Sequence, residues 1–252
     1  MSQFETAQRH LTQALKRLEA ALELRMSERH GGSVRTGAPA TIHLGEERVS
    51  FVSTGVGRFE AGHVIAAVPW FAFAALFEGE TGAIADLVAR SRAMASSPIV
   101  TVNLWLEGPI FEEPFVGLPG REMQWVFDKR QAFGPSASHL SLVSSGAAAI
   151  AARSNDELIA AAHAEIVEAF PRARQVRLLR ATVIREPNAT FSLAPGQPTR
   201  PGTSTPIRGL YIAGDWVDTG LPATIESAVR SGHAAADHAI RQQATVVERA
   251  GI

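Results

Sequence analysis

The spacing of apolar residues divides the chain into helical and β-type stretches. Near the N-terminus apolar residues recur at steps of three and four, which predicts an amphipathic helix over residues 5–29. Its apolar stripe consists of Leu11, Leu15, Leu18, Leu22 and Met26. The pair Gly31-Gly32 ends this helix, and a short strand over residues 33–36 and a turn at Gly37 are expected to follow.

From residue 41 to residue 68 the pattern changes to short apolar or alternating runs between glycine-rich breaks. It predicts strands over residues 41–44, 49–53 and 63–68. The third run, His63-Val64-Ile65-Ala66-Ala67-Val68, is the most continuously apolar. This composition is typical of a strand that is buried on both faces in a parallel sheet.

The middle of the chain is predicted to contain, in order, a helix, three strands, a second helix and a fourth strand. The helices are predicted over residues 84–94 and 156–170, and Ser154 or Asn155 is expected to cap the second one. The strands are predicted over residues 99–106, 123–128, 139–144 and 176–184. In the first strand apolar and polar residues alternate, which indicates a half-buried antiparallel strand.

The last third of the chain opens with a proline-rich coil over residues 187–208. A coil of that length inside a compact protein is usually functional or crosses between domains. A strand over residues 209–213, a glycine- and proline-containing turn, and a helix over residues 223–243 are expected after it.

Bulk composition narrows the class of protein. The net charge is −1 without a long basic run, so the sequence predicts no nucleic-acid partner. The absence of cysteine excludes disulfides and thiolate metal sites from this chain. No apolar run is long enough to span a bilayer, and the charged N-terminus does not resemble a signal peptide. We therefore expect a cytoplasmic location, and peripheral contact with a membrane stays open.

The stretch from Gly209 to Ala228 carries the most chemical information. An apolar strand ends in Gly214-Asp215, a short loop follows, and a helix begins with small residues. The free N–H groups of a helix start favour an anion or an electron-rich ring edge, and a carboxylate at a strand end can accept hydrogen bonds from a hydroxyl chain. The same residues also fit an ordinary strand-ending turn, so the pattern alone leaves both interpretations open.

These residues resemble a known family. Residues 210–215 followed by 223–236 are similar to the C-terminal flavin motif of the amine oxidase and phytoene desaturase superfamily. A weaker similarity runs from 31–37 through 63–70, the middle part of the same flavin domain. Within the superfamily, residues 189–191, 214–216 and 219–224 most resemble the squalene-associated FAD-dependent desaturases, also called hydroxysqualene dehydroxylases. The likeness extends from about residue 18 to residue 239.

The resemblance implies an α/β protein with an incomplete Rossmann-like FAD-binding domain and an inserted α+β substrate domain that contains an antiparallel sheet. Residues 1–72 and 205–252 would form the remaining part of the FAD domain, and residues 73–204 the substrate domain. The implied reaction is hydride transfer between flavin and an isoprenoid lipid. Dehydroxylation of hydroxysqualene to squalene is the main expectation, and a phytoene-type desaturase or another amine-oxidase-like flavoenzyme is the alternative.

The resemblance also implies a role for individual residues toward FAD. Asp215 would hydrogen-bond the ribityl or pyrophosphate part, and Gly214 would permit close approach of the backbone. The N–H of Ile225 would face the pyrimidine edge of the flavin. The other expected cofactor-binding positions are Ala223, Thr224, Pro69 and, beside the adenine, Ala40. No catalytic residue is identified.

The main departure from the family is the lack of its opening strand, G-x-G-x-x-G turn and helix, which receive the pyrophosphate. The nearest string, from Gly55 to Glu60, ends in glutamate and is interpreted as a hairpin turn. The chain therefore resembles a family member without its first portion. A late start codon, a fragment of a longer protein, and a split gene in which a partner chain supplies the N-terminal FAD-binding half all stay open. We also expect the isolated chain to be colourless and to associate. A different class of function, a non-catalytic subunit or fragment, stays open.

Other constellations are set aside. Ser138, His139 and Asp128 occur without the G-x-S-x-G string of a hydrolase. His163 and Glu165 lack metal-protease spacing and are expected to be solvated, and no metal site is predicted. Five aromatic residues are interpreted mostly as core, although the family likeness implies that some line an apolar tunnel. They are Trp105, Phe115, Trp125, Phe127 and Phe191.

Overall fold

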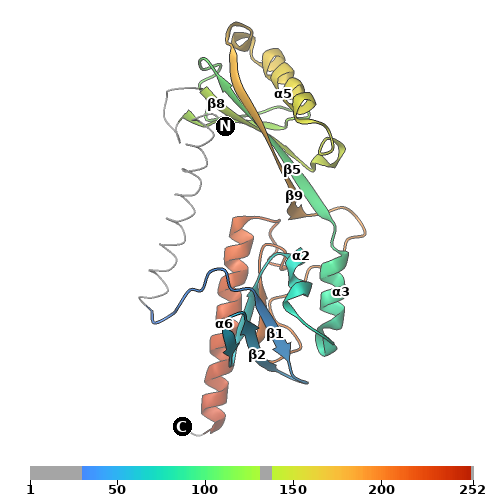
Figure 1. The fold of residues 1–252 in the computed structure, drawn as a ribbon, viewed down its shortest axis with the longest axis vertical. Helices are drawn as coiled ribbons and strands as arrows, with labels where there is room; N and C mark the ends of the chain where they lie inside the picture. Colours follow the sequence, from blue (N-terminus) through green and yellow to red (C-terminus); the bar gives the residue numbers. More distant parts are fainter. Residues whose placement is uncertain (1–29, 131–137, 251–252) are drawn as a thin grey trace.

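A computed structural model describes residues 30–130 and 138–250 (Figure 1). The predicted helix over residues 5–29 lies outside these described residues. Two hydrophobic clusters organise the rest: one surrounds a parallel strand pair, and the other surrounds an antiparallel sheet. We call them the parallel-sheet core and the antiparallel-sheet core. None of the described helices is long and apolar enough to cross a bilayer.

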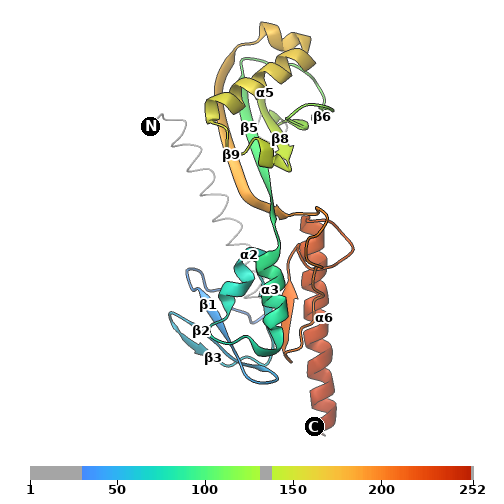
Figure 2. The ribbon, with the colours of Figure 1, turned by 90° about the vertical axis from the view of Figure 1, so that its right-hand side faces the viewer.

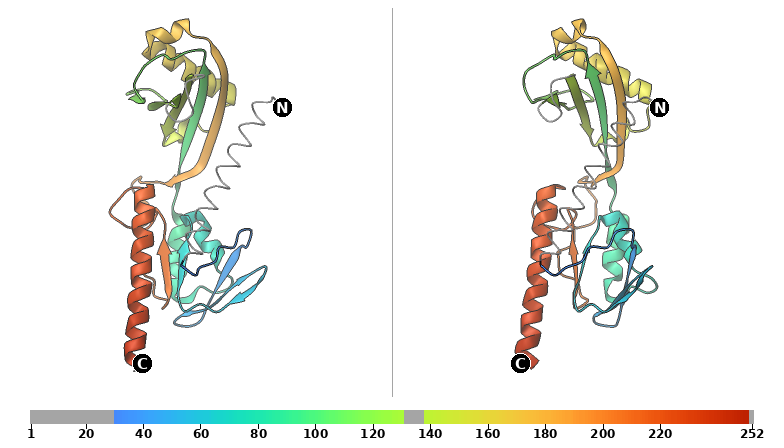
Figure 3. Two further views of the ribbon diagram at one scale, coloured as in Figure 1. Left: turned by 90° about the vertical axis from the view of Figure 1, so that its left-hand side faces the viewer. Right: turned by 60° about the vertical axis from the view of Figure 1, so that its left-hand side comes forward.

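The parallel-sheet core has three layers (Figures 2 and 3). Strands β4 (Val64–Ala67) and β10 (Leu210–Ala213) pair in parallel, which confirms the predicted parallel sheet. On one face lies a meander of β1 (Ala40–Leu44), β2 (Val49–Thr54) and β3 (Gly57–Phe59). On the other face lies α6 (Ile225–Ala250), whose Ala235 packs against β10. The β2–β3 turn confirms the hairpin that was expected at Gly55.

The prediction that β4 is buried on both faces is wrong. Ala66 is only 4% exposed because it faces the meander, whereas Ile65 is 40% exposed on the opposite face. Ala67, which shares that face, is exposed as well. Helix α6 covers the β10 half of this face through Tyr211 and Ala213. Among the described residues no further strand or helix covers the β4 half.

Four helical segments join β4 to the antiparallel sheet. Helix α2 (Trp70–Phe73) and the turns η1 (Ala74–Leu76) and η2 (Gly82–Ile84) lead into α3 (Ala85–Ala93), close to the predicted 84–94. Phe73, Ile84, Leu87 and Met94 are buried in the parallel-sheet core. The domain boundary predicted at residues 72 and 73 falls inside this core, and we propose a boundary near residue 95.

The antiparallel sheet has the strand order β6-β7-β8-β5-β9. Its bounds are β6 Phe115–Gly117, β7 Trp125–Asp128, β8 Ser138–Ser145, β5 Ser96–Leu106 and β9 Leu178–Phe191. Val100, Val102 and Leu104 turn one face of β5 toward α5 (Asn155–Ala169), as the alternation predicted. The turns η3 (Ala147–Ala149) and η4 (Pro171–Gln175) flank α5, and Ser154 caps it through a capping box with Glu157.

Three further predictions are wrong for reasons of tertiary contact. Residues 33–36 form no strand, since no other strand pairs with them in the described chain. The proline-rich coil starts after Phe191, because β9 continues past Pro187 by pairing with Ser96 and Ser97. Glu165 is not solvated: its carboxylate accepts the N–H groups of Glu122 and Met123 at 2.8 and 3.0 Å.

The aromatic residues of this sheet divide into buried and exposed side chains. Trp105 and Phe191 are 9% and 3% exposed, as expected for core. Phe115 and Trp125 are 53% and 44% exposed, so the core interpretation is wrong for these two. The short edge hairpin β6–β7 carries both rings, with centroids 6.1 Å apart, and no helix covers them among the described elements.

Candidate functional site

The carboxyl end of β10 is closed by a tryptophan. Gly214 has φ 142°, and a β-carbon added there would lie 2.8 Å from Cδ1 of Trp216. The Trp216 indole is fully buried and donates from Nε1 to the Val68 carbonyl at 2.8 Å. This bond ties the end of β10 to the end of β4. Glycine is therefore required at position 214 by the protein itself, independently of any ligand.

Two buried serines fasten the first turns of α6 to the end of β10. Ser231 accepts the Gly214 N–H at 2.8 Å, and its hydroxyl lies within 3.0 Å of the Gly214 carbonyl. Ser227 lies 3.3 Å from the Asp215 carbonyl and 2.6 Å from the Thr219 hydroxyl. Both serines are fully buried, and their spacing of four places them on one face of the helix.

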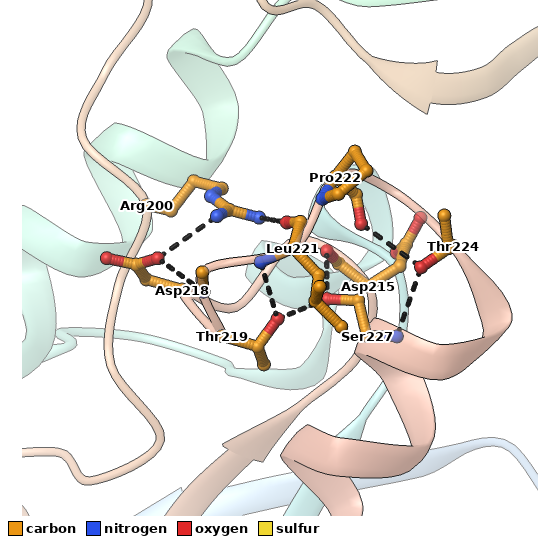
Figure 4. Close-up of polar contacts among 9 residues, drawn as sticks. Arg200, Asp215, Asp218, Thr219, Leu221, Pro222, Thr224 and Ser227 are labelled. Carbon is orange, nitrogen blue, oxygen red and sulfur yellow. Dashed lines mark hydrogen bonds and ion pairs between the residues drawn. The ribbon is translucent and has the colours of Figure 1, made fainter.

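The loop between β10 and α6 is held by Arg200 from the proline-rich coil (Figure 4). Its guanidinium donates to the Leu221 carbonyl at 2.7 Å and to the Asp218 carboxylate at 3.0 Å. The Arg200 side chain is 18% exposed, so its bond to the Leu221 carbonyl is partly buried, whereas the Asp218 side chain is 57% exposed and its bond to Arg200 faces water. A planar guanidinium can make two such bonds at once, which fixes the loop more firmly than a single contact.

The start of α6 presents free N–H groups. Thr224 caps the helix by accepting the Ser227 N–H at 3.2 Å. Within the described part of the chain, the N–H groups of Ile225 and Glu226 have no protein acceptor. The Ile225 side chain is 86% exposed. The helix start therefore offers two donors, a positive dipole end and an apolar surface to a ligand.

Asp215 lies at the junction of β10 with this loop and is partly buried. Burial raises the pKa of its carboxyl group above the ordinary value. The N–H groups of Asp215 and Trp216 and the charge of Arg200 act in the opposite direction without cancelling the effect. A partly desolvated carboxylate gains more from a new hydrogen-bond donor than a solvated one does, which suits the binding of hydroxyl groups.

The structure brings together five of the seven residues predicted to bind the cofactor: Gly214, Asp215, Ala223, Thr224 and Ile225 form one continuous strand end, loop and helix start. Pro69 follows Val68, whose carbonyl Trp216 contacts, and so belongs to the neighbouring strand end. Ala40 begins β1 in the meander, which lies on the face of the parallel sheet opposite α6.

Sequence reasoning did not identify Arg200, Trp216, Ser227 and Ser231 as parts of this site. A signal existed for the serines, because two hydroxyls spaced by four on an alanine-rich helix mark the face that meets a polar partner. Arg200 gave no signal, because its contacts depend on how a long coil folds back. The hydrolase constellation does not form, since Asp128 bonds to Arg130 at 2.7 Å and His139 to Asn103 at 3.0 Å.

Comparison with known proteins identifies the family. A model of the flavin-containing amine oxidoreductase family matches residues 4–240. The chain belongs to this family. The family's description names a flavin, which agrees with the FAD that the sequence predicted. The structural neighbours below share the α/β fold class that the sequence predicted.

Two kinds of relatives are similar in sequence to parts of this chain. The hydroxysqualene dehydroxylase of Rhodopseudomonas palustris is 61% identical over 56 residues, which cover 22% of this chain and 13% of that protein. The hydroxysqualene dehydroxylase of Sinorhizobium fredii is 31% identical over 148 residues, covering 58% of this chain and 33% of the relative. The 15-cis-phytoene desaturase of Solanum lycopersicum is 30% identical over 126 residues, covering 48% and 22%. The chain thus spans a third or less of these relatives.

Solved structures share the fold. Cyclohexylamine oxidase from Brevibacterium oxydans superimposes with a TM-score of 0.65 at 14% identity, covering 85% of this chain and 50% of that one. Putrescine oxidase superimposes with a TM-score of 0.64 at 19% identity, covering 84% and 51%. The chain therefore corresponds to about half of each of these folds.

The residues present fit one end of FAD. The free N–H groups of Ile225 and Glu226 and the carboxylate of Asp215 suit an electron-rich ring edge and a hydroxyl chain, respectively. The diphosphate needs a further set of donors, and the described residues include no glycine-rich turn that opens a helix at the end of β4 or β10.

Proposed function

We propose that this chain supplies the C-terminal portion of an FAD-dependent oxidoreductase that removes the hydroxyl group of hydroxysqualene to give squalene. The observation that carries the proposal is that Gly214, the Asp215 carboxyl group and the free N–H groups at the start of α6 lie together at the carboxyl end of β10. The two hydroxysqualene dehydroxylase relatives support this choice of substrate. Asp215 and the start of α6 would hold one end of FAD, and the reduced cofactor would provide the hydride that replaces the hydroxyl group, which would leave with a proton from solvent as water.

The protein's own contribution is to position the flavin. Arg200 holds the loop at Leu221, and Ser231 holds Gly214 against α6, so that the helix start stays fixed. Asp215 would orient the hydroxyl chain of the cofactor. The N–H of Ile225 would stabilise negative charge on the reduced ring edge. No described side chain near the loop is assigned as a proton donor.

A desaturase of the phytoene type is the second candidate, because the tomato phytoene desaturase is 30% identical over 126 residues. A substrate panel separates the two. The chain is combined with an N-terminal flavin-binding portion and incubated with hydroxysqualene, phytoene or simple amines, with reduced and with oxidised flavin. We expect squalene from hydroxysqualene with reduced flavin. If phytoene is the substrate that reacts, and only with oxidised flavin, the result would favour the desaturase. If amines are the only substrates that react, the result would reject both isoprenoid functions.

We further propose that a partner polypeptide carries the diphosphate-binding portion. The proposal is supported by the described residues, which include no glycine-rich turn that opens a helix at the end of β4 or β10 and could receive the diphosphate. The alternative of a non-catalytic subunit predicts that the combined complex binds FAD but turns over no substrate in the panel. A cytoplasmic location with peripheral contact to a membrane remains a prediction, and a lipophilic substrate is consistent with such contact.

A further inference from the structure

A cleft lies at the amino end of the parallel strand pair, opposite the carboxyl end that carries the flavin site. It has a volume of about 750 Å³, and its walls come from the meander, from the residues that precede β4 and β10, and from the C-terminal part of α6. Strand β10, four residues or about 13 Å long, separates Arg208 at the cleft from Gly214 at the flavin site. The cleft is therefore a separate candidate site.

Two arginines are paired with each other at this cleft. A parallel β-bridge joins Arg48 to Arg208. The Arg208 N–H donates to the Glu47 carbonyl at 2.8 Å, and the Arg208 carbonyl accepts the Val49 N–H at 3.3 Å. Val49 and Ile207 are buried in the parallel-sheet core, so the alternation of side chains directs Arg48 and Arg208 together to the outside, where both line the cleft. Like charges opposite each other on neighbouring strands are destabilising.

The described residues around the two arginines do not balance their charge. Within the described chain, no carboxylate forms an ion pair with either guanidinium. The carboxylate that lines the cleft belongs to Glu60 and is bound by Arg58 at 2.7 Å. The two glutamates of the adjoining turn, Glu46 and Glu47, are exposed and line no part of the cleft. The cleft therefore carries an excess of positive charge.

Hydrogen-bond donors complete the lining. The side-chain carbonyl of Gln242 accepts the Tyr211 hydroxyl at 2.7 Å, which leaves the amide N–H groups of Gln242 for the cleft. Ser50 adds a hydroxyl. Donors and two positive charges in one cleft suit a phosphate monoester, whose oxygens accept bonds from several donors and whose double charge offsets two guanidinium groups. A carboxylate carries only half of that charge.

We infer that this cleft binds a phosphate monoester between Arg48 and Arg208. The group is carried either by a free phosphate compound or by the headgroup of an anionic phospholipid. Its negative charge removes the repulsion between the two arginines, so binding stabilises the bridge that joins the meander to the start of β10. The inference is independent of the proposed function, because none of these residues belongs to the flavin site.

Equilibrium dialysis of the full chain against inorganic phosphate tests the site directly. We expect saturable binding of a single phosphate per chain. Arg48→Gln and Arg208→Gln should each raise the dissociation constant about tenfold or more, as expected for the loss of a charge-assisted hydrogen bond. Arg92→Gln is the matched control, because it removes an exposed arginine of α3 that does not line the cleft, and it should leave the dissociation constant unchanged.

Thermal unfolding gives a second measurement and shows whether the variants fold. The melting temperature is compared in sodium phosphate and in sodium chloride of equal ionic strength. Phosphate also stabilises proteins generally, and this contribution raises all the melting temperatures alike. We expect a larger rise in phosphate for the unmodified chain and Arg92→Gln than for Arg48→Gln and Arg208→Gln. If neither cleft variant folds, dialysis of the unmodified chain remains decisive.

Flotation with lipid vesicles identifies the source of the phosphate. Flotation of the unmodified chain with vesicles of phosphatidylcholine and phosphatidic acid, lost in Arg48→Gln and absent with phosphatidylcholine alone, would assign the headgroup. Binding of inorganic phosphate without such flotation would assign a free compound. Three results overturn the inference: no saturable binding of phosphate in dialysis, equal binding by the unmodified chain and both cleft variants, or an equal loss of binding in Arg92→Gln.

Discussion

At Gly214 the backbone and the Trp216 indole leave no room for a side chain. Gly214→Ala is expected to lower the free energy of unfolding by about 1–3 kcal/mol, because it combines a strained φ with a collision against a buried ring. Gly232→Ala is the matched control, since a β-carbon there meets nothing within 4 Å. In the helix it should raise stability by up to about 1 kcal/mol. Denaturant unfolding measures both, and equal effects would contradict this account of position 214.

Asp215 should make stability depend on pH. Burial raises the pKa of its carboxyl group in the folded chain, so the folded state holds this proton more tightly than the unfolded state does. Stability is therefore lost as pH rises from about 4, the unfolded value, through the folded pKa. Asp215→Asn removes this loss. The melting temperature of the variant minus that of the unmodified chain should therefore increase as pH rises from 4 to 7.

Thermal unfolding across this pH range tests the Asp215 prediction. Asp237→Asn, which changes an exposed carboxylate on α6, controls for the general effect of removing one negative charge. A difference between Asp215→Asn and the unmodified chain that stays constant with pH, or shrinks as pH rises, would be inconsistent with a raised pKa.

At the scale of elements, the loop before α6 depends on a residue from the proline-rich coil. A lysine at position 200 cannot contact the Leu221 carbonyl and the Asp218 carboxylate with one planar group. Arg200→Lys should therefore weaken FAD binding in the combined complex by about 1 kcal/mol, the value of one lost hydrogen bond. Arg92→Lys, at an exposed position of α3, should have no effect. Equal dissociation constants for FAD in the two variants would show that the contacts of Arg200 with the loop do not contribute to FAD binding.

Elements with strong local signals were predictable from the sequence, and elements made by distant contacts were not. The periodicity of α5 and its Ser154 cap, and the alternation along β5, were sufficient to place them. The far end of β9 was missed, because pairing with Ser96 and Ser97 overrides the local effect of Pro187. The strand end and helix start of the site were predicted because they form one continuous stretch of sequence. Arg200 was missed because it lies outside that stretch.

At the scale of the whole molecule, Ile65 and Ala67 on β4 are exposed, and no other described strand pairs with the outer edge of β4, which predicts association of the isolated chain. We expect the chain alone to be colourless after purification and to sediment as species larger than a monomer as concentration rises. Combination with the complementary portion should convert it to a yellow complex of defined size. A colourless chain that stays monomeric at every concentration would contradict the predicted association.

The central claim is that Asp215 and the start of α6 hold one end of FAD. It is tested most directly by titrating FAD into the complex of this chain with the complementary portion, for the unmodified chain and for Asp215→Ala. Loss of a hydrogen bond to a charged group should weaken FAD binding by about 1.5–3 kcal/mol, a rise in dissociation constant of roughly tenfold or more. An unchanged dissociation constant and unchanged flavin content in Asp215→Ala would contradict the claim.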